Sequence, residues 1–140
     1  VRRQQLLSQA EIREVIAAAT LLKAKGAYNY ETRADTLYLQ QRGFFQSALP
    51  DIFEKICTLV GQTDAVHWGL LAGYDGEIGH DVNARCIEFH EYGEHARGLC
   101  GCHTDSGSFF TVDIMLSHQE DFEGGEFLTT VAAPAPAKEK

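Results

Sequence analysis

The spacing of apolar residues changes along the chain from a helical period to a period of two. In residues 6–26 and 49–61, apolar side chains recur every three or four positions, which is typical of helices that pack through one face. Beyond residue 64, apolar and polar residues alternate, and this alternation predicts strands at 65–74, 84–92, 108–117 and 124–130. Helices followed by strands predict an α+β fold, in which an antiparallel sheet or barrel is backed by helices.

The first predicted helix carries signals at both of its ends. Ser8 and Glu11 have the spacing of a capping box, in which each side chain accepts a hydrogen bond from the backbone N–H of the other residue. Leu7 and Ile12 occupy the positions of a hydrophobic staple, and Gly26 supplies the stop. The face expected to pack inward comprises Ile12, Val15, Ile16, Ala19 and Leu22.

The second predicted helix begins near Pro50, whose fixed φ suits the first helical position. Cys57 lies near the buried edge of this helix and is interpreted as a core cysteine. Residues 28–46, between the two helices, are expected to be irregular apart from a short strand around residues 37–39. The face expected to be buried comprises Ile52, Phe53, Ile56, Leu59 and Val60.

Length and charge narrow the class of protein. The 140 residues suit one domain, which we divide into a helical support region at 1–64, a sheet core at 65–131 and a loop or linker tail at 132–140. The formal net charge of -8 and the scattered Lys and Arg residues argue against a nucleic-acid partner. No apolar run reaches the roughly 18 residues of a membrane span, so we expect a soluble protein without a membrane partner.

Cysteine usage and the two chain ends add two further expectations. The four cysteines lack the even spacing of a disulfide scaffold, which favours a reducing compartment such as the cytoplasm. The sequence starts at Val1 rather than at a methionine, and it ends in the Pro/Ala/Lys stretch "VAAPAPAKEK" directly after an apolar run. We therefore expect a fragment of a longer chain.

The candidate chemistry lies in the stretch "CGCHTDSGSFFTVDIMLS", residues 100–117. Residues two apart in a strand point to the same face, so His103 and Asp105 can direct an imidazole nitrogen and a carboxylate oxygen at one point. This pair is two thirds of a 2-His-1-carboxylate triad, which suits non-haem Fe(II). The spacing alone is common, and the simplest alternative is a turn in which Asp105 caps backbone N–H groups.

A zinc site is a second alternative for the same stretch. Cys100, Cys102 and His103 supply thiolate and imidazole ligands, which zinc prefers. A zinc site needs a fourth ligand and usually a gap of about two to four residues between its cysteines, whereas here a single residue separates them.

Three segments in order carry a family resemblance. "RCIEFHEYGE", "CHTDSGSFFTVDIMLS" and "DFEGGEF" resemble the 2-oxoglutarate- and Fe(II)-dependent dioxygenases of the prolyl 4-hydroxylase-like group, most specifically over residues 84–128. The resemblance implies a double-stranded β-helix core, of the jelly-roll or cupin-like kind, with the N-terminal helices packed on it and its C-terminal part missing. It also implies an enzyme that uses O₂ to hydroxylate a C–H bond, with a prolyl residue of a peptide or protein, or a small molecule, as substrate.

The resemblance also assigns residues to the cofactors. His103 and Asp105 become iron ligands, Tyr92 falls where the family places a phenol beside 2-oxoglutarate, and Thr111 and Met115 fall on the strand face that lines the cosubstrate pocket. Ascorbate is a further cofactor that the resemblance implies. Asp113 shares this face, and on the pocket side it would need a cationic or hydrogen-bonding partner.

The sequence departs from the family pattern after residue 117. The family requires a second histidine several dozen residues after the first and then an Arg or Lys for the far carboxylate of 2-oxoglutarate, and neither occurs within the 140 residues. We therefore expect this chain alone to be inactive. A non-catalytic β-helix binding module, in which the His-x-Asp pair is a remnant or a turn, is the alternative function.

Several other polar and aromatic residues have both a structural and a functional interpretation. Tyr92 is either a cosubstrate contact or a strand-end aromatic. His90 shares the face of Tyr92 with Glu88 and Cys86, and a structural role is favoured over a place in the cavity. Trp68 is interpreted as a core residue in preference to a substrate-side wall. The acidic loop at 118–126 is interpreted as a solvated loop, and the functional alternative is that a basic peptide substrate binds it.

Overall fold

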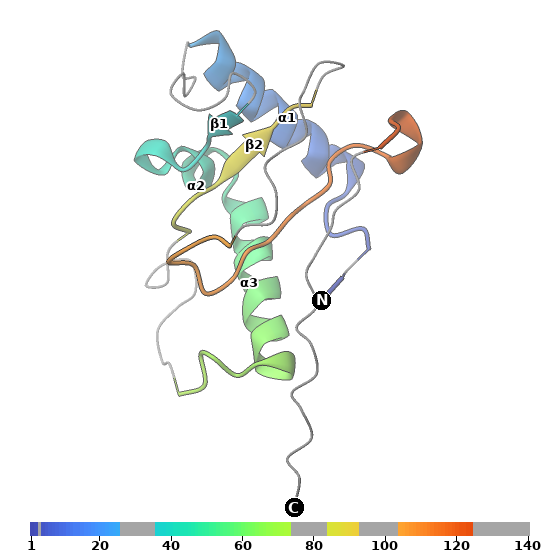
Figure 1. Cartoon of the computed structure of the whole chain (residues 1–140). Helices are drawn as coiled ribbons and strands as arrows, with labels where there is room; N and C mark the ends of the chain where they lie inside the picture. The colour runs from blue at the N-terminus through green and yellow to red at the C-terminus, as the bar shows by residue number, and fades with distance from the viewer. Residues whose placement is uncertain (3, 26–35, 74–83, 93–103, 125–140) are drawn as a thin grey trace, which may run out of the picture. The chain divides into compact units, whose positions relative to one another are not determined.

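A computed structural model of the chain describes residues 1–2, 4–25, 36–73, 84–92 and 104–124, and these residues alone are considered below. They divide into two compact units, Val1–Ala96 (unit 1) and Arg97–Lys140 (unit 2), each of which is described by itself. Figure 1 shows the course of the chain. No helix within the described ranges combines the length and apolar character needed to cross a membrane.

Helix α1 (Gln9–Ala24) opens unit 1, and its predicted capping box is confirmed. The Glu11 N–H donates to the Ser8 hydroxyl over 3.3 Å, and the Ser8 N–H donates to a Glu11 carboxylate oxygen over 2.6 Å. The predicted inward face is confirmed at Val15 and Ala19, which are buried. Ile16 was expected on this face but is 43% exposed, and the small side chain of Ala18 is buried beside Ala19 in its place.

Unit 1 also contains a short antiparallel sheet, made by β1 (Thr36–Tyr38) and β2 (Glu88–His90). Leu37 lies opposite Phe89 in the register, and Leu37 and Leu39 are the most deeply buried large side chains among the described residues. Figure 1 shows the two strands side by side, and α1 packs against β1. The strands predicted near 37–39 and within 84–92 are therefore confirmed, at three residues each.

Hydrogen bonds and one ion pair extend the contact between these elements. The Leu39 N–H donates to the Ile87 carbonyl oxygen over 2.8 Å, which continues the ladder past β1. Lys23, in the last turn of α1, forms an ion pair with Glu91, the residue that follows β2. The segment 87–91 is thereby held by β1 and by the last turn of α1.

The chain then passes through a 3₁₀ turn, η1 (Gln41–Gly43), into α2 (Phe44–Ala48) and the long helix α3 (Pro50–His67). Pro50 occupies the start of α3, as predicted. The rings of Phe45 and Phe53 pack edge to face, with centroids 6.3 Å apart, which joins α2 to α3. Ile52 is buried as expected, whereas the other four residues of the predicted face are only half-buried.

The strand predicted at 65–74 is wrong over its described part. Helix α3 continues to His67, and residues 68–73 form turns in which Gly69 and Gly73 take positive φ angles of 62° and 83°. Trp68, expected in the core, is 53% exposed at the end of the helix. The carbonyl oxygen of Asp64 accepts the N–H groups of Trp68 and Gly69, so helix-end hydrogen bonding overrides the local alternation of apolar residues.

Unit 2 contains a turn, an irregular run and a 3₁₀ turn, η2 (Gln119–Asp121). The strand predicted at 108–117 has no ladder partner within the described ranges, and its period of two is kept only in part, because Val112 on the apolar side is 41% exposed. Phe110, Ile114 and Leu116 are half-buried, while Thr111 and Asp113 are exposed. The double-stranded β-helix stays a prediction, because the strand at 124–130 and the end of the chain lie largely outside the described residues.

Candidate functional site

Asp105 begins a tight turn in unit 2. The Ser108 N–H donates to the Asp105 carbonyl oxygen over 3.2 Å, and Gly107 takes a φ of 83°, a conformation that favours glycine. The turn leads the chain back so that the Thr111 hydroxyl donates to Oδ2 of Asp105 over 2.8 Å. The Asp105 carboxylate is exposed and held by a side chain six residues further along the chain.

The hydroxyl contact on Asp105 was not predicted from the sequence. In metal sites, carboxylates that bind the metal are themselves hydrogen-bonded by an outer partner, which fixes their orientation. In the structure Thr111 contacts Asp105, whereas the resemblance implies a place for Thr111 in the cosubstrate pocket. The one signal that could have revealed it is a Thr at the start of the apolar run, within reach of a turn that contains Gly.

The other predicted iron ligand, His103, lies outside the described residues, as do Cys100 and Cys102 of the zinc alternative. Within the described ranges, no group of three or more His, Cys, Asp or Glu side chains is placed to hold a metal ion. The pairing of His103 with Asp105 therefore stays a prediction from their spacing.

Thr111, Asp113 and Met115 are all exposed in unit 2, consistent with one shared strand face. Met115 is 59% exposed, so its predicted contact with the cosubstrate stays a prediction. The Asp113 carboxylate is exposed, and the partner that it would need on the pocket side stays unassigned.

His90 and Tyr92 form a ring pair in unit 1, at the end of β2. Their ring centroids are 6.0 Å apart with an interplanar angle of 19°. His90 Nε2 lies 3.0 Å from a Glu88 carboxylate oxygen, and Nδ1 lies 3.1 Å from the Thr36 hydroxyl on β1. The structural interpretation of His90 is thus confirmed, because both ring nitrogens have protein partners. Tyr92 is 62% exposed.

Cys86 stands on the same face of the chain, two residues before Glu88. Its thiol donates to the second Glu88 carboxylate oxygen over 3.2 Å. Partial burial, and then the hydrogen bond to the Glu88 carboxylate, raise the pKa of the Cys86 thiol to about 11. Burial also raises the pKa of Cys57. Neither thiol is therefore activated as a thiolate near neutral pH.

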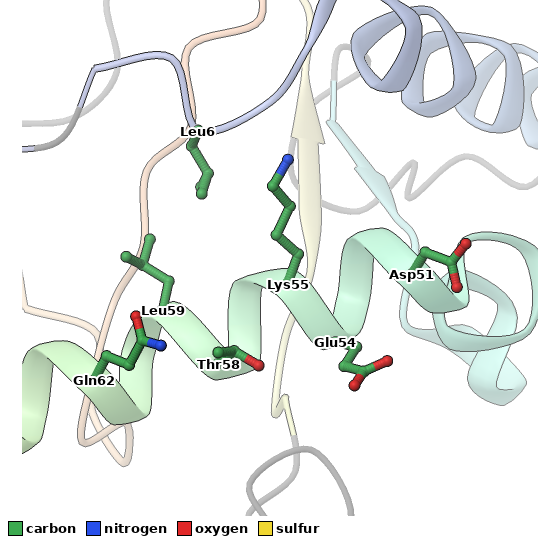
Figure 2. Close-up of a pocket in the computed structure, with 7 residues that line it drawn as sticks. All are labelled: Leu6, Asp51, Glu54, Lys55, Thr58, Leu59 and Gln62. Atoms are coloured by element: carbon green, nitrogen blue, oxygen red, sulfur yellow. The ribbon is translucent and has the colours of Figure 1, made fainter.

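A separate open cavity of about 440 Å³ lies in unit 1, between Leu6 and one side of α3. Figure 2 shows Leu6 of the N-terminal segment facing Leu59, with Lys55 beside them. The Lys55 ammonium lies 2.9 and 3.0 Å from the two Glu11 carboxylate oxygens, so its charge is already paired. None of the predicted site residues lines this cavity.

Comparisons with known proteins found no matching family model, no matching curated protein and no matching solved structure.

Proposed function

We propose that the protein is an Fe(II)- and 2-oxoglutarate-dependent dioxygenase that hydroxylates a C–H bond. Its main support is the ordered sequence pattern: a strand-like run ending at Tyr92, the pair His103 and Asp105, an apolar run, and a Gly-Gly-Glu segment. The single structural observation that favours this function over a plain turn is the Thr111 hydroxyl on the exposed Asp105 carboxylate.

The residues suit a ferrous ion on chemical grounds. Imidazole and carboxylate ligands from His103 and Asp105 match the donor set of non-haem Fe(II) sites. Thr111 would hold the Asp105 carboxylate in one orientation, as outer partners do in metal sites. A third ligand is required, and the family places that histidine further along the chain than Asp105.

Bound Fe(II), with 2-oxoglutarate and O₂ as cosubstrates, would supply the oxidising power for hydroxylation. The chain's own residues would position the cosubstrate: the Tyr92 phenol would hydrogen-bond 2-oxoglutarate, and Met115 would line its pocket. Family analogy favours a prolyl residue of a peptide or protein as substrate, which is an argument from class.

The test is an anaerobic titration of the full-length protein with Fe(II) and 2-oxoglutarate, followed by its weak visible charge-transfer absorption. We expect a band in the wild type and none in His103→Ala or Asp105→Ala. Glu120→Gln, which neutralises an exposed carboxylate in the same unit, is the matched control and should retain the band. A folded wild-type protein without the band would contradict the proposal and leave the non-catalytic binding module.

The same samples separate iron from zinc. Metal analysis after purification should find iron in the wild-type protein and little or none in His103→Ala and Asp105→Ala. If zinc is found instead, and is lost in Cys100→Ser and Cys102→Ser, the zinc alternative replaces the dioxygenase.

A further inference from the structure

His90 is held at both of its ring nitrogens, by partners from two different strands. Glu88 is a carboxylate and can only accept, so in the neutral ring Nε2 carries the hydrogen and donates to Glu88. Nδ1 then accepts the hydroxyl proton of Thr36, which is 4% exposed. A buried hydroxyl on β1 and a carboxylate on β2 therefore fix the plane of the imidazole.

The fixed imidazole in turn restrains Tyr92. The two rings lie nearly parallel, at an interplanar angle of 19° and a centroid distance of 6.0 Å, within the range of favourable offset stacking. Tyr92 is 62% exposed and follows β2, where the strand pairing has ended. The imidazole is thus a flat surface beside a phenol ring that extends beyond the paired strand.

We infer that His90 is a positioning residue for Tyr92, which sets the phenol ring before the cosubstrate binds. The inference rests on the proposed function, in which Tyr92 contacts 2-oxoglutarate. An exposed tyrosine loses rotamer freedom when it binds a ligand, and a preformed stack removes part of that cost in advance. Without the stack, the affinity for 2-oxoglutarate should fall by about three- to tenfold.

The experiment measures the dissociation constant of 2-oxoglutarate for the full-length, Fe(II)-loaded protein under anaerobic conditions. His90→Gln keeps groups that can bond Thr36 and Glu88 but removes the ring, and His90→Ala removes both. We expect both variants to weaken binding to a similar extent. Cys86→Ser is the matched control, since it keeps a donor to Glu88 and leaves the ring pair intact.

A double variant tests whether His90 acts through Tyr92. We expect His90→Gln combined with Tyr92→Ala to bind 2-oxoglutarate no more weakly than Tyr92→Ala alone, because coupled residues are not additive. Additive losses, or full affinity in His90→Gln, would overturn the positioning role while leaving the dioxygenase intact. No binding by the wild type would overturn the proposed function, and the positioning role with it.

The NMR signals of the Tyr92 ring give a readout that does not depend on the cosubstrate. They should shift in His90→Gln, since the neighbouring ring current is lost, and stay in place in Cys86→Ser. Unchanged Tyr92 signals in His90→Gln would contradict the stacked arrangement and the inference built on it.

Discussion

Two aspartates, one in each unit, end up in opposite environments. Asp64 is 2% exposed near the end of α3, and its carboxylate oxygens accept the N–H groups of Leu70 and Leu71, each over 2.9 Å. Asp105 is exposed in the turn of unit 2, and its carboxylate accepts the Thr111 hydroxyl. The first carboxylate is engaged by backbone donors on both oxygens, while the second is held by a side chain and reaches solvent.

The difference shows how a structural carboxylate can be separated from a candidate metal ligand. A buried carboxylate persists only where hydrogen bonds compensate its desolvation, and the two amides at the end of α3 do so for Asp64. An exposed carboxylate carries no such cost, so burial does not account for the Thr111 hydroxyl on Asp105; in the proposed site this hydroxyl would fix the orientation of the carboxylate. Substitution of Asp105 should therefore affect Fe(II) binding and leave stability unchanged, whereas substitution of Asp64 should affect stability and leave Fe(II) binding unchanged.

The largest effect is expected for Asp105→Asn in the full-length protein. Loss of an outer partner alone weakens metal sites by about 10–100-fold, so loss of a ligand should weaken Fe(II) binding by more than about 100-fold. The free energy of unfolding should change by less than about 0.5 kcal/mol, since the side chain is exposed. Anaerobic Fe(II) titration and urea unfolding of the apoprotein measure the two quantities. Iron binding that survives the substitution would remove Asp105 from the site.

Asp64→Asn should reverse this pattern. The amide nitrogen would face a backbone N–H that now has no acceptor, which costs about 1–3 kcal/mol of unfolding free energy. Iron affinity should stay within a factor of about two, because Asp64 takes no part in the proposed site. Asp113→Asn makes the same chemical change at an exposed position and should leave the urea midpoint in place. A stable Asp64→Asn protein would show that the helix end does not depend on this carboxylate.

A smaller effect is expected for Thr111→Val, which removes the hydroxyl from Asp105 and keeps the side-chain shape. Iron affinity should fall by about tenfold, at the lower end of the range for outer partners. Thr111→Ser retains the hydroxyl and should restore most of the affinity. If both variants bind iron as the wild type does, Thr111 would belong only to the turn.

The elements that were predicted correctly from the sequence are those whose signals are local. The capping box of Ser8 and Glu11 depends on residues three apart, and Pro50 marks the start of α3 by itself. The wrong strand prediction at residues 65–73 also came from a local signal, the alternation of apolar residues. The alternating pattern predicts a strand, but the stop signal Gly69 and the acceptor Asp64 lie within one helical turn of the end of α3.

The candidate site was predictable only where spacing along the chain decides it. The two-residue interval from His103 to Asp105 is visible in the sequence. The Thr111 contact depends on how the turn at Gly107 leads the chain back, and the Thr36 contact of His90 depends on the register between two strands distant in sequence. Neither the geometry of a turn nor a strand register follows from the identity of the residues that it brings together.

Glu11 is a third case for the comparison of Asp64 with Asp105, because its carboxylate lies at the surface and yet has a structural role. A hydrogen bond from the Lys55 ammonium, followed by those from the Ser8 backbone and side chain, lowers the pKa of Glu11 from 4.5 to about 2. A depressed pKa contributes stability above the unfolded value, and this contribution is lost as the pH falls from 4.5 toward 2.

The thermal midpoint of Glu11→Gln should therefore lie below that of the wild type at pH 6, and the two should converge toward pH 2. Lys55→Met removes the largest cause, so the pKa of Glu11 should rise back toward 4.5, and the pH-dependent difference from Glu11→Gln should become smaller and end at a higher pH. If the difference in thermal midpoint between wild type and Glu11→Gln were the same at pH 6 and pH 2, the charge of Glu11 would not account for its structural role. The partners of the two carboxylates, Lys55 and Ser8 for Glu11 and Thr111 for Asp105, would then no longer distinguish a structural carboxylate from a candidate ligand.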